Sequence, residues 1–321
     1  FRQKFAIETT LGKVFASILA SLLLISSTLA SDNSYTAEIE RRINLWLVEQ
    51  GQEPLYKTPR DMLDSYPATR IVGNLFDVGT VDLGVFLITS PAGHILINTG
   101  LEGSINVIAR NIRDLGFTLK DVKILLIMQS HFDHAGDLQS IRELTGAEVL
   151  ATKEDAVILQ DGGYSDPLFG GFESFRPVNV DKFIADEDTI VLGNIELKVH
   201  FHPGHTKGSV SYSMQIEEED KNYDVLIVNM AYINSGTRFI ENPTYEQIYD
   251  DFVSTIHSQQ AMSPDIWVSA HKSQYGFHEK YARGKPYDKD TFYDPKGYLE
   301  AIKEHELRFE EHIYLERMEV L

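Results

Sequence analysis

Residues 127–136 read Ile127-Met128-Gln129-Ser130-His131-Phe132-Asp133-His134-Ala135-Gly136. The apolar run before them, residues 122–127, predicts a buried parallel strand, and a helical pattern follows over residues 136–144. These polar side chains therefore crowd the carboxyl end of a strand, where open α/β sheets place their ligand sites. Neutral imidazoles and a carboxylate are donors that Zn²⁺ selects. The stretch predicts a metal site, although a lone His at a strand end is usually a structural residue.

Composition limits the classes of partner. The chain has 321 residues, no Cys and a formal net charge of −19. Acidity on this scale argues against nucleic acid and anionic membrane surfaces as partners. The absence of Cys excludes disulfides, thiolate metal ligands and a Cys nucleophile. The length and the apolar fraction of 43% suit one large globular domain, which we place at residues 31–321.

Residues 1–30 have the pattern of a secretory signal peptide. Basic Arg2, Lys4 and Lys13 precede an apolar run over residues 14–25, and small residues follow up to Ala30. The apolar run is shorter than the roughly 20 residues that span a membrane as a helix. We therefore expect export to the periplasm, cleavage near Ala30 and no membrane association of the mature chain.

Hydrophobic periodicity beyond the leader predicts two similar halves of strands and helices. An amphipathic helix is expected over residues 34–50 and an irregular connector over residues 51–67, so that residues 31–69 lie over the core. The Gly- and aromatic-rich residues 162–175 suit a mobile loop near a substrate. The order predicts an α/β fold with two packed mixed β-sheets and helices on both outer faces, an αββα sandwich. Strands are expected over residues 70–79, 85–89, 94–100, 122–127, 147–151, 189–192, 195–200, 212–217, 225–229 and 265–270, and helices over residues 104–115, 136–144, 153–159, 245–260 and 295–317.

Further His residues follow later strands. His205 lies in Pro203-Gly204-His205-Thr206-Lys207-Gly208-Ser209, and His271 lies in Ser269-Ala270-His271-Lys272-Ser273. Together with residues 129–134, a variant of the HxHxDH motif, these segments resemble the metallo-β-lactamases over nearly the whole mature chain. Gln129 stands where the first His is expected. The sequence is most similar to subclass B3, and there to the GOB-like members that carry Gln at this position.

The resemblance implies two metal positions. The first would be built from Gln129, His131 and His205, and the second from Asp133, His134 and His271. An amide oxygen is a weaker donor for Zn²⁺ than an imidazole nitrogen. We therefore expect the second position to fill first, with a single zinc there favoured.

The resemblance also implies a zinc-dependent β-lactamase that hydrolyses penicillins, cephalosporins and carbapenems and confers antibiotic resistance. Zinc supplies hydroxide at neutral pH, and Asp133 would orient the attacking water as well as bind metal. β-Lactams carry a carboxylate, so Lys207, Lys272 and Arg238 are candidate substrate contacts, together with Met230. A monomer is expected, with the small-molecule β-lactam as its partner.

Other functions stay open. Lactonases, phosphoesterases and glyoxalase II-like thioesterases of this fold usually carry a bridging Asp where Asn229-Met230-Ala231 stands here, and Met230 fits the GOB-like branch. A secreted zinc-binding protein that lost catalysis with the first His is a further alternative. Asn98 replaces a frequent Asp of the family and puts the usual network around the ligands in doubt.

The remaining His residues have simpler interpretations. His200 and His202 share a strand face with His205, and we expect them to orient ligands or stabilise the structure. The others, expected to be surface or packing residues, are His94, His257, His278, His305 and His312.

Overall fold

The computed structural model describes residues 34–49 and 57–318. These ranges belong to two separate compact units, residues 1–56 and residues 57–321. In the first unit, α2 (Ser34–Glu49) confirms the predicted helix, and the Glu38 carboxylate accepts hydrogen bonds from Arg41 and Arg42 on its surface. The predicted leader and its cleavage point lie outside the described residues. The placement of residues 31–69 over the core stays a prediction.

Residues 57–318 contain two mixed sheets, as predicted. The seven-stranded sheet has the order β1-β2-β3-β4-β5-β6-β7, and the five-stranded sheet has the order β12-β11-β10-β9-β8. β4, β5, β6 and β7 pair in parallel, as do β11 and β12, and the other pairs are antiparallel. The strands are β1 (Thr69–Val72), β2 (Leu75–Asp77), β3 (Phe86–Ser90), β4 (Gly93–Ile97), β5 (Val122–Leu126), β6 (Glu148–Ala151), β7 (Lys182–Phe183), β8 (Thr189–Leu192), β9 (Ile195–Phe201), β10 (Val210–Glu218), β11 (Lys221–Val228) and β12 (Ile266–Ser269).

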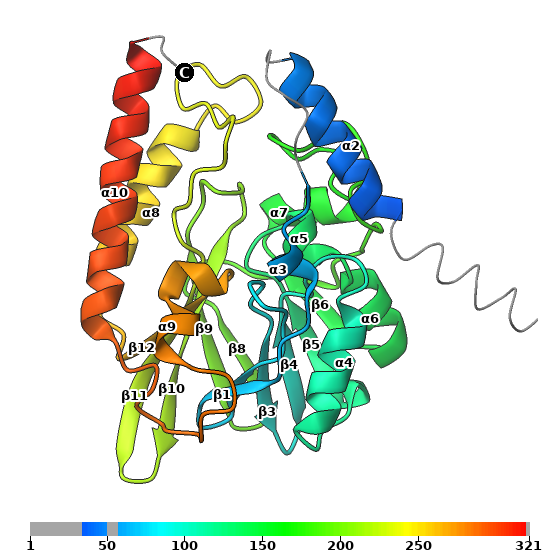
Figure 1. The fold of residues 1–321 in the computed structure, drawn as a ribbon, viewed down its shortest axis with the longest axis vertical. Coiled ribbons are helices and arrows are strands. Elements are labelled where there is room, and N and C mark those ends of the chain that lie inside the picture. The colour runs from blue at the N-terminus through cyan, green and yellow to red at the C-terminus, as the bar shows by residue number, and fades with distance from the viewer. Residues whose placement is uncertain (1–33, 50–56, 319–321) are drawn as a thin grey trace, which may run out of the picture. The chain divides into compact units, whose positions relative to one another are not determined.

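Helices cover the outer faces of both sheets (Figure 1). α4 and α6 lie beside the seven-stranded sheet, and α8 and α10 lie beside the five-stranded sheet. None of the helices in the described ranges combines the length and apolar character needed to cross a membrane. The helices of this unit are α3 (Arg60–Leu63), α4 (Ile105–Asp114), η1 (Leu119–Asp121), α5 (Phe132–Ala135), α6 (Leu138–Thr145), α7 (Lys153–Gln160), α8 (Ile248–Gln260), η2 (Lys272–Tyr275), α9 (Phe277–Lys280) and α10 (Pro295–Arg317).

The two faces of the seven-stranded sheet contribute to two different cores. Phe86 and Ile88 of β3 belong to the core shared with the five-stranded sheet, whereas Leu87 packs with α4 and α6. This alternation follows from the two-residue period of a strand. Each such fully buried side chain stabilises the fold by about 1.5–3 kcal/mol relative to an exposed one. The sandwich therefore rests on strands that are apolar on both faces.

One predicted strand was wrong in its extent. Residues 70–79 form two strands rather than one, because Gly73 and Asn74 make a tight turn between β1 and β2. Gly73 has a φ of +52°, in the left-handed region that glycine adopts without steric strain. The predicted helix over residues 136–144 is also preceded by a separate short helix, α5, which carries part of the metal motif.

Candidate metal centre

The expected ligands converge from three strand ends. Residues 129–131 lie in the short connection between β5 and α5, and Asp133 and His134 lie on α5. His205 lies in the connection between β9 and β10, and His271 follows β12. The carboxyl ends of strands from both sheets thus supply the site, as expected for an α/β protein.

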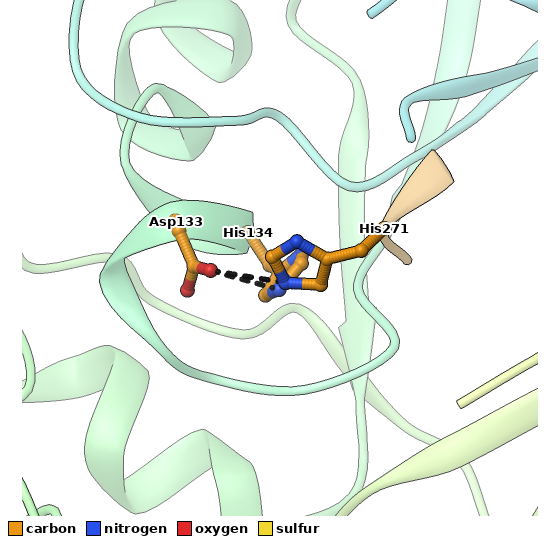
Figure 2. Close-up of side chains that lie close together, drawn as sticks. All are labelled: Asp133, His134 and His271. Carbon is orange, nitrogen blue, oxygen red and sulfur yellow. Dashed lines mark ion pairs between the residues drawn. The ribbon is translucent and has the colours of Figure 1, made fainter. Parts of the chain in front are cut away.

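Asp133, His134 and His271 form a compact cluster in the described part of the chain. Each offers one ligand atom, and these atoms all lie within 4.8 Å of one another. Asp133 Oδ2 is 3.3 Å from His134 Nε2 and 3.4 Å from His271 Nε2. Figure 2 shows the three side chains pointing toward one another, two from α5 and one from the segment after β12. One carboxylate and two imidazoles suit a catalytic zinc that keeps an open coordination place.

Asp82 orients His271 through the other ring nitrogen. His271 Nδ1 lies 2.8 Å from Asp82 Oδ2, and Asp82 Oδ1 accepts a hydrogen bond of 2.9 Å from Ser273 N. Burial lowers the pKa of His271, but its hydrogen bonds to Asp133 and Asp82 raise it to about 10. The two carboxylates therefore favour positive charge at this point, and a divalent cation satisfies the same preference.

The ring of His134 has the character of a ligand rather than of a packing residue. It is fully buried, and neither ring nitrogen has a well-directed hydrogen bond within the described residues, although Nε2 lies 3.3 Å from Asp133 Oδ2. Burial lowers the pKa of His134, so the ring is neutral. Its backbone carbonyl accepts hydrogen bonds from Thr99 N at 2.8 Å and Thr99 Oγ1 at 3.0 Å. A buried polar ring without a partner costs free energy that a bound cation would offset.

The first position brings two further rings together. The centroids of His131 and His205 lie 4.9 Å apart. His205 Nδ1 is 2.7 Å from Tyr232 O, which only accepts, so Nδ1 carries the proton and Nε2 is left free. Gln129 is buried, and its Oε1 has no hydrogen-bond partner in the described ranges. Burial lowers the pKa of His205 to about 3, so this ring is also a neutral donor.

Asp166 reaches His131 from the loop of residues 162–175. Its Oδ2 lies 3.3 Å from His131 Nε2, and both side chains are 4% exposed. Burial alone would raise the pKa of Asp166, but His131 lowers it. The pKa of His131 is raised by Asp166 against the effect of burial. The loop is the one predicted to lie near a substrate, and no sequence pattern distinguishes Asp166 within it.

Comparison with known proteins identifies the family. Residues 85–218, which include all the expected ligands except His271, match the Metallo-beta-lactamase superfamily. The metallo-β-lactamase GOB-18 from Elizabethkingia meningoseptica is 40% identical, with a TM-score of 0.79 over 81% of this chain and 96% of that chain. The chain belongs to the metallo-β-lactamase superfamily. The class B3 di-zinc metallo-β-lactamase LRA-12 from an Alaskan soil metagenome is 41% identical, with a TM-score of 0.78 over 80% of this chain and 98% of that chain.

A curated relative matches this superfamily member over a shorter stretch. The hydroxyacylglutathione hydrolase of Maricaulis maris is 33% identical over 87 residues, which are 27% of this chain. The chain spans 27% of the length of that relative. The likeness therefore extends to another branch of the superfamily, in one part of the chain.

Asp155 of α7 holds the loop that carries His205. Its Oδ2 accepts a hydrogen bond of 2.9 Å from Thr206 Oγ1, and its Oδ1 accepts one of 2.9 Å from Gly208 N. Burial raises the pKa of Asp155 to about 6, against the lowering effect of these hydrogen bonds. A Cβ on Gly208 would lie 2.1 Å from Thr152 Oγ1, so the close approach of this loop to α7 requires glycine. No sequence pattern distinguishes Asp155 from the other acidic residues.

Asn98 connects the strands around the metal motif. Asn98 Oδ1 accepts a hydrogen bond of 3.0 Å from Met128 N, and its Nδ2 donates one of 3.2 Å to Gly84 O. Its φ of 65° is in the left-handed region, which Asn tolerates better than most residues. In this superfamily member, the amide fixes the backbone next to Gln129 without adding a charge.

Two of the four candidate substrate contacts are buried elsewhere. Lys272 is fully buried, with its Nζ 2.8 Å from Asp77 Oδ1 and 2.7 Å from Thr80 O, so it does not reach a substrate. Met230 is 1% exposed and belongs to the core between the sheets. These two expectations are wrong for the described structure. Because His271 is extended, its successor Lys272 points to the opposite side of the chain.

The other two candidates stay accessible. Lys207 is half-buried, and its Nζ lies 5.3 Å from the centroid of the Tyr245 ring. The side chain of Arg238 is 64% exposed, with its Nε 4.0 Å from Glu316 Oε1. Neither contact shows that the side chain of Lys207 or Arg238 binds a substrate.

His200 and His202 take part in polar contacts of the second sheet. His200 Nε2 lies 2.7 Å from Ser213 Oγ, and the buried His202 ring lies 2.6 Å from Ser211 Oγ and 3.1 Å from Ser258 Oγ. Both nitrogens of His202 are therefore engaged with hydroxyl groups. These contacts agree with a structural interpretation of His202.

Proposed function

We propose that the chain is a zinc-dependent β-lactamase of subclass B3, similar to the GOB-like members. One observation carries the proposal: Asp133, His134 and His271 offer three ligand atoms within 4.8 Å of one another. The similarity to GOB-18 and LRA-12 supports the choice of β-lactams as substrate class. Zinc in this position supplies a nucleophile at neutral pH by lowering the pKa of water.

Asp133 has the properties of the residue that orients this water. Burial would raise the pKa of its carboxyl, but His134 and His271 hold the pKa well below the usual range. The carboxylate is therefore ionised at neutral pH and accepts hydrogen bonds. Its side chain is 14% exposed and that of His271 is 18% exposed, whereas His134 is fully buried, so water and substrate approach from the side of Asp133 and His271.

The segment after β11 favours a β-lactamase over a thioesterase. β11 ends at Val228, and Asn229-Met230-Ala231 follows where thioesterases of the fold usually carry a bridging Asp. This segment contains no carboxylate to hold two metals close together. With Gln129 as a neutral donor, the first position is the weaker one, and we propose that one zinc in the second position suffices for activity.

Substrate recognition has to offset the charge of the protein. A net charge of −19 repels a β-lactam carboxylate at long range. Lys207, two residues after His205, is the half-buried cation that we propose for this contact, with the exposed Arg238 as a weaker candidate. We further propose a monomer that is exported to the periplasm, where β-lactams act on the cell wall.

A hydrolysis assay tests the proposal. Purified residues 31–321, loaded with zinc, should hydrolyse nitrocefin and imipenem, and a chelator should abolish the activity. Asp133→Asn should be inactive, and Asp114→Asn, the same change on the exposed face of α4, should keep the activity. Zinc-loaded, folded protein without hydrolysis of any penicillin, cephalosporin or carbapenem would contradict the proposal.

The match to a hydroxyacylglutathione hydrolase favours a second candidate, a thioesterase. The same preparation should therefore be assayed with a hydroxyacyl thioester of glutathione. Turnover of the thioester without turnover of β-lactams would select this alternative. Zinc binding without either activity would select the non-catalytic zinc-binding protein.

A further inference from the structure

The carboxylate of Asp166 is held in a fixed orientation by its own loop. Asp166 Oδ1 accepts hydrogen bonds from Leu168 N at 2.8 Å and Phe169 N at 2.6 Å. The Phe169 ring packs edge-on against the His131 ring, with centroids 5.1 Å apart. The loop thus closes over His131 and turns the other carboxylate oxygen toward it.

That other oxygen is buried and has no assigned partner. Asp166 Oδ2 lies 3.3 Å from His131 Nε2, without a well-directed hydrogen bond from any described residue. Leaving a carboxylate oxygen buried and unpaired is costly. A small rotation of either ring or carboxylate would give a hydrogen bond between these two atoms.

Two other rings of the centre, those of His271 and His205, each have an oxygen acceptor at Nδ1. His271 has a carboxylate oxygen of Asp82 at 2.8 Å from Nδ1, and His205 has a carbonyl oxygen of Tyr232 at 2.7 Å from Nδ1. A metal-binding His usually donates its second N–H to such an acceptor, which fixes the tautomer and the ring orientation. For His131 the acceptor is Asp166, and it faces Nε2, which leaves Nδ1 as the nitrogen available to a metal.

We propose that Asp166 is a positioning residue of the first metal position. It accepts the Nε2–H of His131 and supplies the negative charge that Gln129, His131 and His205 lack. The inference rests on the proposed zinc-dependent function and deepens it for this position. Asp166 thereby does for the first position what Asp82 does for the second.

Zinc binding measured without any substrate tests this inference. Asp166→Asn keeps an oxygen to accept from Leu168 N and Phe169 N, so the loop turn survives, and it removes the charge. Metal-free protein is titrated with Zn²⁺ against a chelating indicator, which gives a tighter and a weaker dissociation constant. We expect Asp166→Asn to raise the weaker constant by about 10- to 100-fold and the tighter one by less than about twofold.

Two matched variants assign the effect. Glu173→Gln removes a charge from an exposed position of the same loop and should change neither constant. Asp82→Asn should raise the tighter constant instead. In ¹⁵N-histidine-labelled protein, His131 should show the Nε2–H tautomer, and Asp166→Asn should convert it to a mixture of tautomers. A change confined to loop stability would not alter this signal.

Three outcomes would overturn the inference: an unchanged weaker constant in Asp166→Asn, an equal loss in both constants, or a wild-type protein that takes up one zinc even with zinc in excess. A wild-type protein that binds two zinc ions but hydrolyses no β-lactam would contradict the proposed function and leave the role of Asp166 intact. A protein that binds no zinc would contradict both.

Discussion

His271 lies between two carboxylates, with its Nδ1 2.8 Å from Asp82 Oδ2 and its Nε2 3.4 Å from Asp133 Oδ2. Nδ1 thus faces the acceptor that orients the ring, and Nε2 faces the metal position. Asp82 also accepts from Ser273 N, so it fixes the backbone after β12 as well as the ring. The second metal position therefore has two negative charges close to it.

Asp82→Asn should weaken zinc binding at the second position by about 10- to 100-fold, because the variant loses the charge that orients His271. Competition with a chelating indicator measures the affinity. Asp64→Asn, an exposed change directly after α3, is the control and should bind zinc like the wild type. Equal affinities for Asp82→Asn and Asp64→Asn would show that the pairing is irrelevant to the metal.

Asp133→Asn should lose nearly all turnover of nitrocefin while the fold survives. The amide neither carries the charge that binds the cation nor accepts as strongly from water. Turnover is followed spectrophotometrically, and circular dichroism checks the fold. Activity like that of the wild type with an unchanged spectrum would remove Asp133 from the mechanism.

A single zinc should suffice for hydrolysis. When metal-free protein is titrated with Zn²⁺, activity should rise to most of its final value within the first equivalent, because the second position keeps its charged ligand set. Gln129→His should raise zinc occupancy of the first position without being required for activity. Activity that stays near zero up to one equivalent and appears only with the second would refute this prediction.

His202 should make the protein sensitive to acid. Burial lowers its pKa from 6.5 to about 3 in the fold, so the unfolded chain binds the proton more readily. The stability that depends on neutral His202 is therefore present above pH 6.5 and lost as the pH falls toward 3, by up to about 1.4 kcal/mol per pH unit. His202→Gln should lose less stability between pH 6.5 and 4 than the wild type, measured by urea unfolding. Parallel pH profiles for the two proteins would refute the assignment.

Export should leave a mature chain that begins at Ser31 or within a residue or two of it. The basis is the apolar run over residues 14–25 followed by small residues up to Ala30. N-terminal sequencing of protein from the periplasm of an expressing bacterium checks this. Cytosolic protein that retains residues 1–30 would show that the leader is not processed.

The sheets were predictable because they carry local signals, since strand alternation and apolar runs identify β3, β5 and β12 from sequence. The motif spacing brings Asp133, His134 and His271 together as predicted, and the assignment of Gln129 and His131 as ligands stays a prediction. The turn at Gly73 and Asn74 was missed although this pair interrupts the apolar run, because apolar residues on both sides of it were assigned to one strand. Hydrophobic periodicity shows which side chains share a face of a strand, but it does not by itself show where the chain turns back into a second strand.

The residues that orient the ligands were not predictable. Asp82, Asp155 and Asp166 are three among 48 acidic residues of the chain, and no local pattern distinguishes them. Each becomes significant only when a segment distant in sequence brings a ligand loop beside it. Lys272 was predicted to contact substrate because it is adjacent to His271 in sequence. Its side chain points away from the metal position, so proximity in sequence was misleading here.

The buried pair of Lys272 and Asp77 restricts how this protein can be redesigned. Removing one member of such a pair costs about 3–5 kcal/mol, a large part of the roughly 5–15 kcal/mol that stabilises a typical domain. A library that randomises the residues after His271 to alter substrate preference would therefore return lysine at position 272 in nearly every folded clone. Replacement becomes accessible when both positions change together, so the two residues form one unit of sequence variation, although they are 195 positions apart in the sequence.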